Sequence, residues 1–211
     1  MPLQNRVTPY SSIEVAPARG LLMGNRGCLH NDQRELVSQR WRHRAWISCV
    51  LQHGDRRRTL MQPRHYTELF FLDEAVALAA GHRPCALCRR AAFEAFRTAV
   101  STQSRVRATQ LDAMLHSERV ARMRGQVSWR DTLGNLPDGS MIVLPDVPDQ
   151  VWLKHKGCLL RWSHVGYDCA IPLSDAQIVE VLTPPTIRCA LAAGYEPILH
   201  SSVGGSSALG S

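Results

Sequence analysis

Several features are missing from this sequence of 211 residues, and each absence excludes a class of protein. No apolar run approaches the ~20 residues that span a bilayer, so no membrane protein is expected. The first 20 residues lack the apolar stretch of a secretory signal, which favours a cytoplasmic protein. The Walker loop, the GxGxxG fingerprint, the nucleophile elbow and the HExxH motif are also absent. The enzyme classes that depend on these motifs are therefore not expected.

Lysine is missing from the basic half of the chain. Residues 1–110 hold 17 arginines and no lysine against 8 acidic residues, whereas residues 111–211 hold 8 basic and 10 acidic residues. A guanidinium group binds phosphate with a fixed fork and stacks on bases. Contact with DNA or RNA is therefore predicted for the arginines interleaved with tryptophan and those after the Gly-Asp pair: Arg42, Arg44, Arg56, Arg57 and Arg58. A solvated surface in an arginine-biased sequence explains the same pattern without function.

The cysteines do not form the regular, even-numbered set of a disulfide-rich secreted domain. There are seven of them, at irregular spacing. In a chain without an export signal, they are expected to be reduced thiols, some of them bound to metal. No disulfide-linked partner is predicted.

The order of apolar runs, turns and helix signals predicts an α+β protein. Residues 1–26 are expected to form an extended arm, and residues 27–124 a zinc module with an N-terminal β-hairpin and helices. Residues 125–200 are expected to form a small, mostly antiparallel β unit with a C-terminal helix. Residues 201–211, rich in Gly and Ser, are expected to be a disordered tail.

Within the zinc module, the expected hairpin spans residues 44–62, and "ELFF" (68–71) is a third short strand. Asp73 is the expected N-cap of an alanine-rich helix that Gly81 ends. Two further helices are expected, one starting directly after Pro84 and one over residues 111–123.

One segment occurs twice. "ALAAGHRP" (77–84) recurs as "ALAAGYEP" (190–197), identical at six of eight positions. Where the first copy continues to Cys85 and Cys88, the second has Ile and Ser. The helix end with its glycine, ring and proline is thus predicted to be a packing device that does not require the thiols.

The two cysteines of "RPCALC" (83–88) have three interpretations. A C-x2-C knuckle directs both sulfurs at one zinc ion ~2.3 Å away. A redox dithiol has the same spacing but normally follows the first strand of a βαβ unit, whereas a helix and an Arg-Pro pair precede this one. Two inert buried cysteines are the third possibility. The context favours metal.

The stretch "FFLDEAVALAAGHRPCALC" (70–88) resembles the second half of the zinc-binding module of Ada-type DNA alkylation-repair proteins. That module has an aromatic pair, a short alanine-rich helix, then Ala-Gly-aromatic-Arg-Pro-Cys and a second Cys three residues on. The resemblance covers about 19 of the 211 residues and implies a local zinc module. Cys85 and Cys88 match its two C-terminal zinc ligands.

The upstream part departs from that module, which takes its other two ligands from a C-x3-C pair that includes the methyl acceptor. This sequence has no such pair, so repair by methyl transfer is not expected. The upstream candidates for metal ligands are Cys28, His30, Cys49, His53 and His65. We predict that Cys49 and His30 complete the site, with Cys28 and His65 as reserves.

Three functions are compatible with these features. The preferred one is a structural Zn²⁺ site in a protein that contacts nucleic acid through its arginines. The alternative is a zinc-dependent hydrolase or lyase that acts on a small molecule at an open coordination position. His116 could then be a base or an extra ligand, although a partly exposed helical histidine without such a role is the preferred explanation. The third is a scaffold protein without catalysis or nucleic acid.

Overall fold

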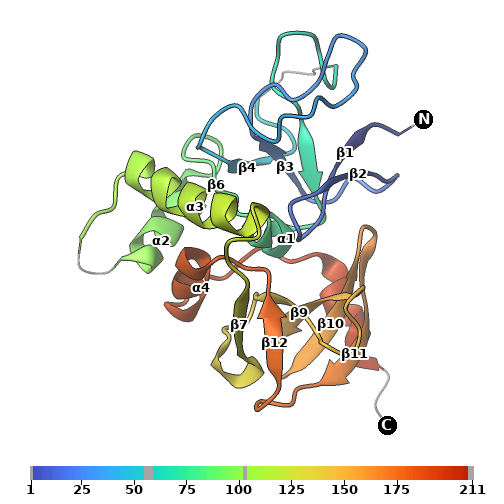
Figure 1. The fold of residues 1–211 in the computed structure, drawn as a ribbon, viewed down its shortest axis with the longest axis vertical. Helices are drawn as coiled ribbons and strands as arrows, with labels where there is room; N and C mark the ends of the chain where they lie inside the picture. The colour runs from blue at the N-terminus through green and yellow to red at the C-terminus, as the bar shows by residue number, and fades with distance from the viewer. Residues whose placement is uncertain (1, 55–58, 102–103, 209–211) are drawn as a thin grey trace.

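A computed structural model describes residues 2–54, 59–101 and 104–208 of the chain. In these residues four α-helices and two six-stranded sheets form a mixed α+β fold, as predicted. Figure 1 shows one sheet above and one below the short helix α1 (Glu74–Ala79). None of the helices in the described ranges is long and apolar enough to cross a membrane.

The first sheet has the strand order β2-β1-β5-β3-β4-β6. Its strands are β1 (Gln4–Val7), β2 (Ile13–Val15), β3 (Leu22–Asn25), β4 (Ile47–Val50), β5 (Leu69–Phe71) and β6 (Arg83–Pro84). Strand β3 is antiparallel to both β4 and β5, whereas β4 and β6 are parallel. The expected strand at 68–71 is thus confirmed.

Two expectations about this sheet are wrong. Residues 1–26 are not an extended arm, because they contribute β1, β2 and β3, and their side chains Val7, Ile13 and Leu22 are buried in the core. The hairpin expected over 44–62 is not formed either. Strand β4 pairs with β3 and β6, and the described residues 59–62 form a turn instead of a strand.

The second sheet is antiparallel throughout, in the order β11-β10-β9-β8-β12-β7. Its strands are β7 (Trp129–Thr132), β8 (Met141–Val143), β9 (Val151–His155), β10 (Cys158–Ser163), β11 (Gly166–Pro172) and β12 (Ile178–Val181), and the 3₁₀ turn η1 (Leu133–Asn135) follows β7. The antiparallel unit predicted for the second half is therefore confirmed.

Helix α1 is buried between the two sheets. All six of its side chains are buried, and one core cluster joins four of them, Ala75, Val76, Ala77 and Ala79, to strands of both sheets. The helix begins as predicted, because the Asp73 carboxylate accepts a hydrogen bond from the Val76 N–H at 3.1 Å. The core therefore continues from the first half of the chain into the second.

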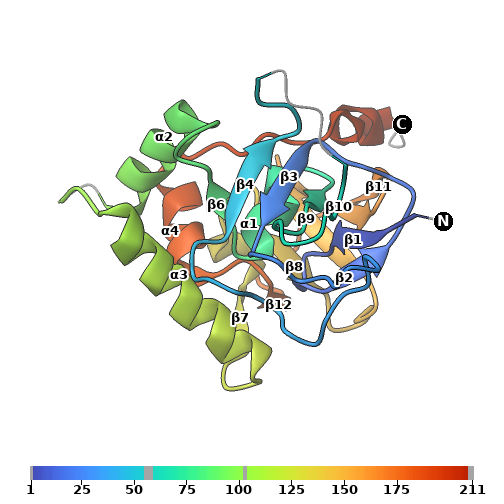
Figure 2. The same ribbon diagram turned by 90° about the horizontal axis from the view of Figure 1, so that it is seen from above.

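Three longer helices gather on one side of the molecule (Figure 2). They are α2 (Arg90–Val100), α3 (Ala108–Met123) and α4 (Pro185–Ala192). Phe93, Phe96, Leu115 and Ile187 are among the residues that form a separate core cluster there. Helix α2 starts later than predicted, because the residues directly after Pro84 form a turn that holds the cysteines.

The tail is also different from the prediction. Instead of being disordered, Ser201–Ala208 form a 3₁₀ helix, η2. The Tyr167 N–H on β11 donates a hydrogen bond of 2.8 Å to the Ser202 Oγ, and Val203 packs against the core cluster that surrounds α1. These contacts hold η2 against the second sheet.

Candidate metal centre

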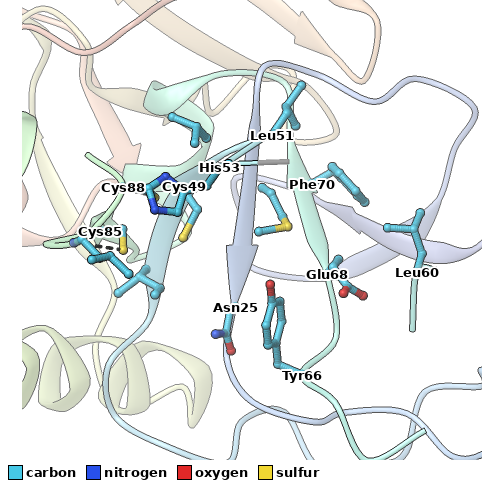
Figure 3. A pocket seen from close by; sticks show the side chains of 15 residues that line it. Asn25, Cys49, Leu51, His53, Leu60, Tyr66, Glu68, Phe70, Cys85 and Cys88 are labelled. Carbon is cyan, nitrogen blue, oxygen red and sulfur yellow. Dashed lines mark hydrogen bonds between the residues drawn. The ribbon is translucent and has the colours of Figure 1, made fainter. Parts of the chain in front are cut away.

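Three cysteine side chains meet at the edge of the first sheet. Cys49 comes from β4, and Cys85 and Cys88 come from the turn that follows β6. Their sulfur atoms all lie within 4.8 Å of one another, and this group could hold a metal ion. Figure 3 shows the three side chains at one end of a cavity. Cys85 is buried and the other two are half-buried.

Strand pairing brings these cysteines together. Ser48 on β4 pairs with Pro84 on the parallel strand β6, and the Cys85 N–H donates to the Ser48 carbonyl at 2.9 Å. Cys49 and Cys85 thus follow directly on paired residues. The chain then turns back, with the Leu87 N–H donating to the Cys85 sulfur at 3.4 Å. This backbone bond orients the sulfur, as in a metal-binding knuckle.

Only one of the three thiols, that of Cys85, ionises easily. The Cys49 thiol donates a hydrogen bond to Cys85, which lowers the pKa of Cys85 to about 4 and raises the pKa of Cys49. Burial raises the pKa of Cys88. A second thiolate is therefore unfavourable beside the first, and a cation bound between the sulfurs would remove that conflict.

The size of the sulfur group suits a metal ion. Metal–sulfur bonds of ~2.3 Å at tetrahedral angles place the sulfurs roughly 3.8 Å apart, which lies inside the observed limit. All seven cysteines fall in the described part of the chain, and each of them is a free thiol. The sulfur donors are therefore available to a metal.

A buried ion pair between Arg89 and Glu74 holds the turn that carries Cys85 and Cys88. Arg89, directly after Cys88, donates to the Glu74 carboxylate at 2.7 Å and to the Ser48 Oγ at 2.9 Å. Tyr195, from the segment after α4, donates its hydroxyl to Glu74 at 2.7 Å. Burial alone would lower the pKa of Arg89, but the bond and charge of Glu74 outweigh it and raise the pKa. The second half of the chain therefore helps to hold the cysteine turn.

A cavity of about 670 Å³ opens beside the three sulfurs. His53 lines this cavity together with the cysteines, and Figure 3 shows its imidazole at the same end. The side chain is exposed, on the loop that follows β4. It lies outside the tight sulfur group but is the one histidine among the described residues that line the cavity.

His53 was one of the upstream candidates but was selected neither as a ligand nor as a reserve, although the sequence contains a signal for it. Cys49 and His53 are four residues apart, as are the two cysteines of the upstream C-x3-C pair in the Ada-type module. Histidine and cysteine both bind zinc. Residues 49 and 53 therefore match that spacing, with a histidine in place of the second cysteine.

The structure does not place His30 with the cysteines. Its two ring nitrogens are engaged elsewhere, with the Thr67 hydroxyl at 2.7 Å and the Gln62 carbonyl at 3.1 Å. The reserves are also separate from the sulfur group. The Cys28 sulfur donates to the His30 carbonyl, and His65 is exposed, with one ring nitrogen on the Pro63 carbonyl. Hydrogen bonds away from the sulfur group thus engage all three candidates.

His116 does not line the cavity. It lies on α3, where its ring packs edge-on against Trp41 at a centroid distance of 5.6 Å. Burial, together with the nearby Arg119 and Arg44, lowers its pKa. The neutral ring is therefore favoured, as expected for a histidine packed on an aromatic side chain.

Of the five arginines predicted to contact nucleic acid, the structure describes two. Arg42 and Arg44 are exposed, on the long loop between β3 and β4. Arg42 also donates to the Cys28 carbonyl at 3.0 Å. Arg56, Arg57 and Arg58 lie outside the described residues.

Other arginines of the basic half are inside the protein. Arg6, Arg26, Arg83 and Arg89 are all buried. The Arg26 guanidinium lies 4.0 Å from the Trp46 ring, and Arg83 forms a two-bond ion pair with Asp112. The charge excess of residues 1–110 therefore overstates the positive charge available to a phosphate backbone.

No protein-family model, curated protein or solved structure matches this chain.

Proposed function

We propose that this chain is a zinc-binding protein in which Cys49, Cys85, Cys88 and His53 hold one structural ion. The observation that carries the proposal is the convergence of three free cysteine sulfurs within 4.8 Å. Soft thiolate ligands favour zinc among the common divalent ions, and a Cys₃His set is frequent in structural zinc sites. His53 is the fourth ligand because it lines the same cavity and follows Cys49 at the C-x3-C spacing.

The ion would tie three parts of the chain together. Cys49 is on β4, His53 is on the loop after it, and the other two ligands are on the turn after β6. Because β6 is a strand of two residues, its pairing with β4 is short, and a shared ion would reinforce it. Binding free energy at such a site appears directly as folding free energy. Zinc removal is therefore expected to loosen the edge of the first sheet.

Elemental analysis of the purified full chain tests this proposal. We expect one zinc per chain, and loss of at least about 100-fold in zinc affinity for Cys85→Ser. The matched control is Cys169→Ser, because Cys169 is exposed and outside the sulfur group. It should keep full zinc content. A wild-type protein that takes up no zinc after reconstitution, or equal zinc binding by Cys85→Ser, would refute the proposal.

Nucleic-acid contact through Arg42 and Arg44 stays a prediction. Its support is that both side chains are exposed on one loop. Binding through phosphates must weaken steeply between low and moderate salt. Replacing both arginines by alanine should lower both the affinity for a generic duplex and its salt dependence. Wild-type binding that does not respond to salt would reject this contact.

A zinc-dependent hydrolase or lyase is the second candidate, and the cavity beside the sulfurs is the observation that favours it. If His53 is not a ligand, the fourth position faces the cavity and is open to water. A metal shell of three sulfurs and one exchangeable oxygen would indicate this function. A shell of three sulfurs and one histidine nitrogen would indicate the structural site.

A further inference from the structure

The cavity beside the sulfur group has the size of a small-molecule site. Its volume of about 670 Å³ lies in the range of ligand pockets, which is roughly 300 to 1,000 Å³. Residues of β3, β4 and β5 line it, together with the loop after β4 and the cysteine turn. In Figure 3 the cysteines and His53 lie at one end, and Glu68 and Phe70 at the other.

The walls of the cavity are largely apolar. Met23 and Phe70 line it from the sheet, and Leu51 and Leu87 line it from the surrounding turns. Leu87 is 77% exposed and Leu51 49%, although both are large apolar side chains. Exposed leucines beside a cavity are typical of a surface that a ligand covers. The walls therefore favour a ligand with an apolar or aromatic body.

The described residues that line the cavity carry a charge opposite to that of the whole protein. Glu68 is only 3% exposed, and one of its carboxylate oxygens accepts the Met61 N–H at 2.7 Å. A divalent ion held by three thiolates and a neutral histidine carries one net negative charge. No lysine or arginine occurs among the described lining residues, whereas the chain as a whole has a formal charge of +7.

We propose that this cavity binds a small organic ammonium ion with an apolar or aromatic body. The ammonium group would pair with the Glu68 carboxylate, and the body would lie along Phe70 and Met23. An ammonium ion is also attracted to the face of an aromatic ring. A phosphate or carboxylate ligand would meet negative charge at both ends of the cavity. The contribution of the thiolate end depends on the metal site proposed above, whereas that of Glu68 does not.

Three probes of similar shape test the proposal on the zinc-loaded full chain. They are 2-phenylethylammonium, the neutral 2-phenylethanol and the anionic 3-phenylpropanoate, with binding followed by calorimetry. We expect the cation to bind at least about 10-fold more tightly than the neutral probe, because the ammonium group adds the attraction of opposite charges to a hydrogen bond that the hydroxyl can also donate. The anion should bind most weakly. Equal affinities, or tightest binding of the anion, would overturn the proposal.

Variants at two positions identify the source of the preference. Glu68→Gln should bring the cation and the neutral probe to within about 2-fold of each other. Because Glu68 also supports the Met61 backbone, exposed Leu87 provides a test that leaves the fold intact. Leu87→Arg should weaken cation binding about 3-fold, and Leu87→Gln should leave the preference unchanged. A folded Glu68→Gln protein with the wild-type preference, together with an unaffected Leu87→Arg, would refute the role of charge.

Zinc content measured on the same samples separates the two proposals. A chain with one bound zinc and no preference for the cation refutes the ammonium site alone. A chain that binds no zinc but prefers the cation refutes the metal site alone, because Glu68 is then sufficient.

Discussion

The two copies of the helix end, 77–84 and 190–197, have the same backbone structure and different surroundings. In the first, Gly81 has a φ of 83° and the N–H of His82 donates to the Ala77 carbonyl. In the second, Gly194 has a φ of 93° and the N–H of Tyr195 donates to the Ala190 carbonyl. The sequence similarity thus corresponds to one helix-ending motif used twice.

The two copies differ in the course of the chain beyond the glycine. The first continues along β6, beside β4, so that its two cysteines meet Cys49. The second has no such strand beside it among the described residues, and its ring and backbone instead support the first copy. Tyr195 and the Ile198 N–H both donate to the Glu74 carboxylate. The convergence of three cysteine sulfurs therefore needs the neighbouring strand as well as the motif.

Removing the charge of Glu74, whose carboxylate joins the two copies, should have the largest effect on the free energy of unfolding. Glu74 is fully buried and pairs with Arg89, which is itself 7% exposed. Glu74→Gln would leave the guanidinium buried without a partner charge, which costs about 3–5 kcal/mol of unfolding free energy. Urea unfolding measures this. The control is Glu196→Gln in the second copy, where the side chain is exposed and the change should stay within about 0.5 kcal/mol. Equal effects of the two changes would contradict the network.

The free energy of unfolding should depend on pH through Asp73, the carboxyl group next to Glu74 in the sequence. Burial raises the pKa of Asp73 from 3.8 to about 6. The folded protein therefore binds this proton more tightly than the unfolded chain, and the free energy of unfolding falls as the pH rises from about 4 to about 6. The expected fall is roughly 3 kcal/mol.

Comparison with Asp73→Asn isolates this contribution, because asparagine does not titrate. Loss of the oxygen that accepts the His200 N–H should destabilise the variant by an amount independent of pH. Urea unfolding at several pH values should give curves that approach each other as the pH rises. Parallel curves would show that the Asp73 carboxyl titrates normally.

Alanine substitutions at the two glycines, compared with each other, separate the cost of backbone strain from the cost of a packing clash. Alanine at either position must adopt a left-handed φ, which costs about 1–2 kcal/mol. At Gly81 the new Cβ would also lie 2.4 Å from the Arg119 Cδ, whereas at Gly194 it would meet nothing within 4 Å. Arg119 cannot easily move, because it donates to the Gly81 and Arg44 carbonyls. Gly81→Ala should thus cost about 1–3 kcal/mol more than Gly194→Ala in thermal unfolding. Equal losses would contradict the tight contact.

The smallest effect is expected from adding thiols to the second copy. Ile198→Cys with Ser201→Cys reproduces the spacing of the first copy at two exposed positions. Because no strand in the described ranges brings a third cysteine to this place, zinc content should stay at one per chain. A second tightly bound zinc would show that the helix-ending motif with two cysteines is sufficient.

Local signals predicted much of the fold. The Asp73 cap and the strand at 69–71 each depend on neighbouring residues, and they were found where expected. Strand partners are set by contacts that are distant in sequence. Strand β4 pairs with β3 across a loop of about twenty residues, and β1 is parallel to β5. The hairpin expected near β4 was wrong for this reason.

The same limit applies to the candidate metal site: its local features could be predicted from the sequence, and its contacts between distant residues could not. The C-x2-C spacing indicated the cysteine turn, and Cys49 was chosen because a hairpin packed beside the helix ends could face that turn. The structure brings Cys49 there through the pairing of β4 with β6 instead. The structure does not bring His30 to the sulfurs, because Thr67 and Gln62 bind its ring, and those contacts join residues more than 30 positions apart. His53, the fourth ligand proposed above, matches the C-x3-C spacing with Cys49 once a histidine is allowed at the second position.

The most direct test of the metal site is X-ray absorption spectroscopy of the zinc-loaded protein. We expect three sulfur atoms at ~2.3 Å and one nitrogen at ~2.0–2.1 Å around the zinc. In His53→Ala the nitrogen should be lost and the three sulfurs retained. A wild-type shell with two or fewer sulfurs would contradict the convergence of Cys49, Cys85 and Cys88 on one ion.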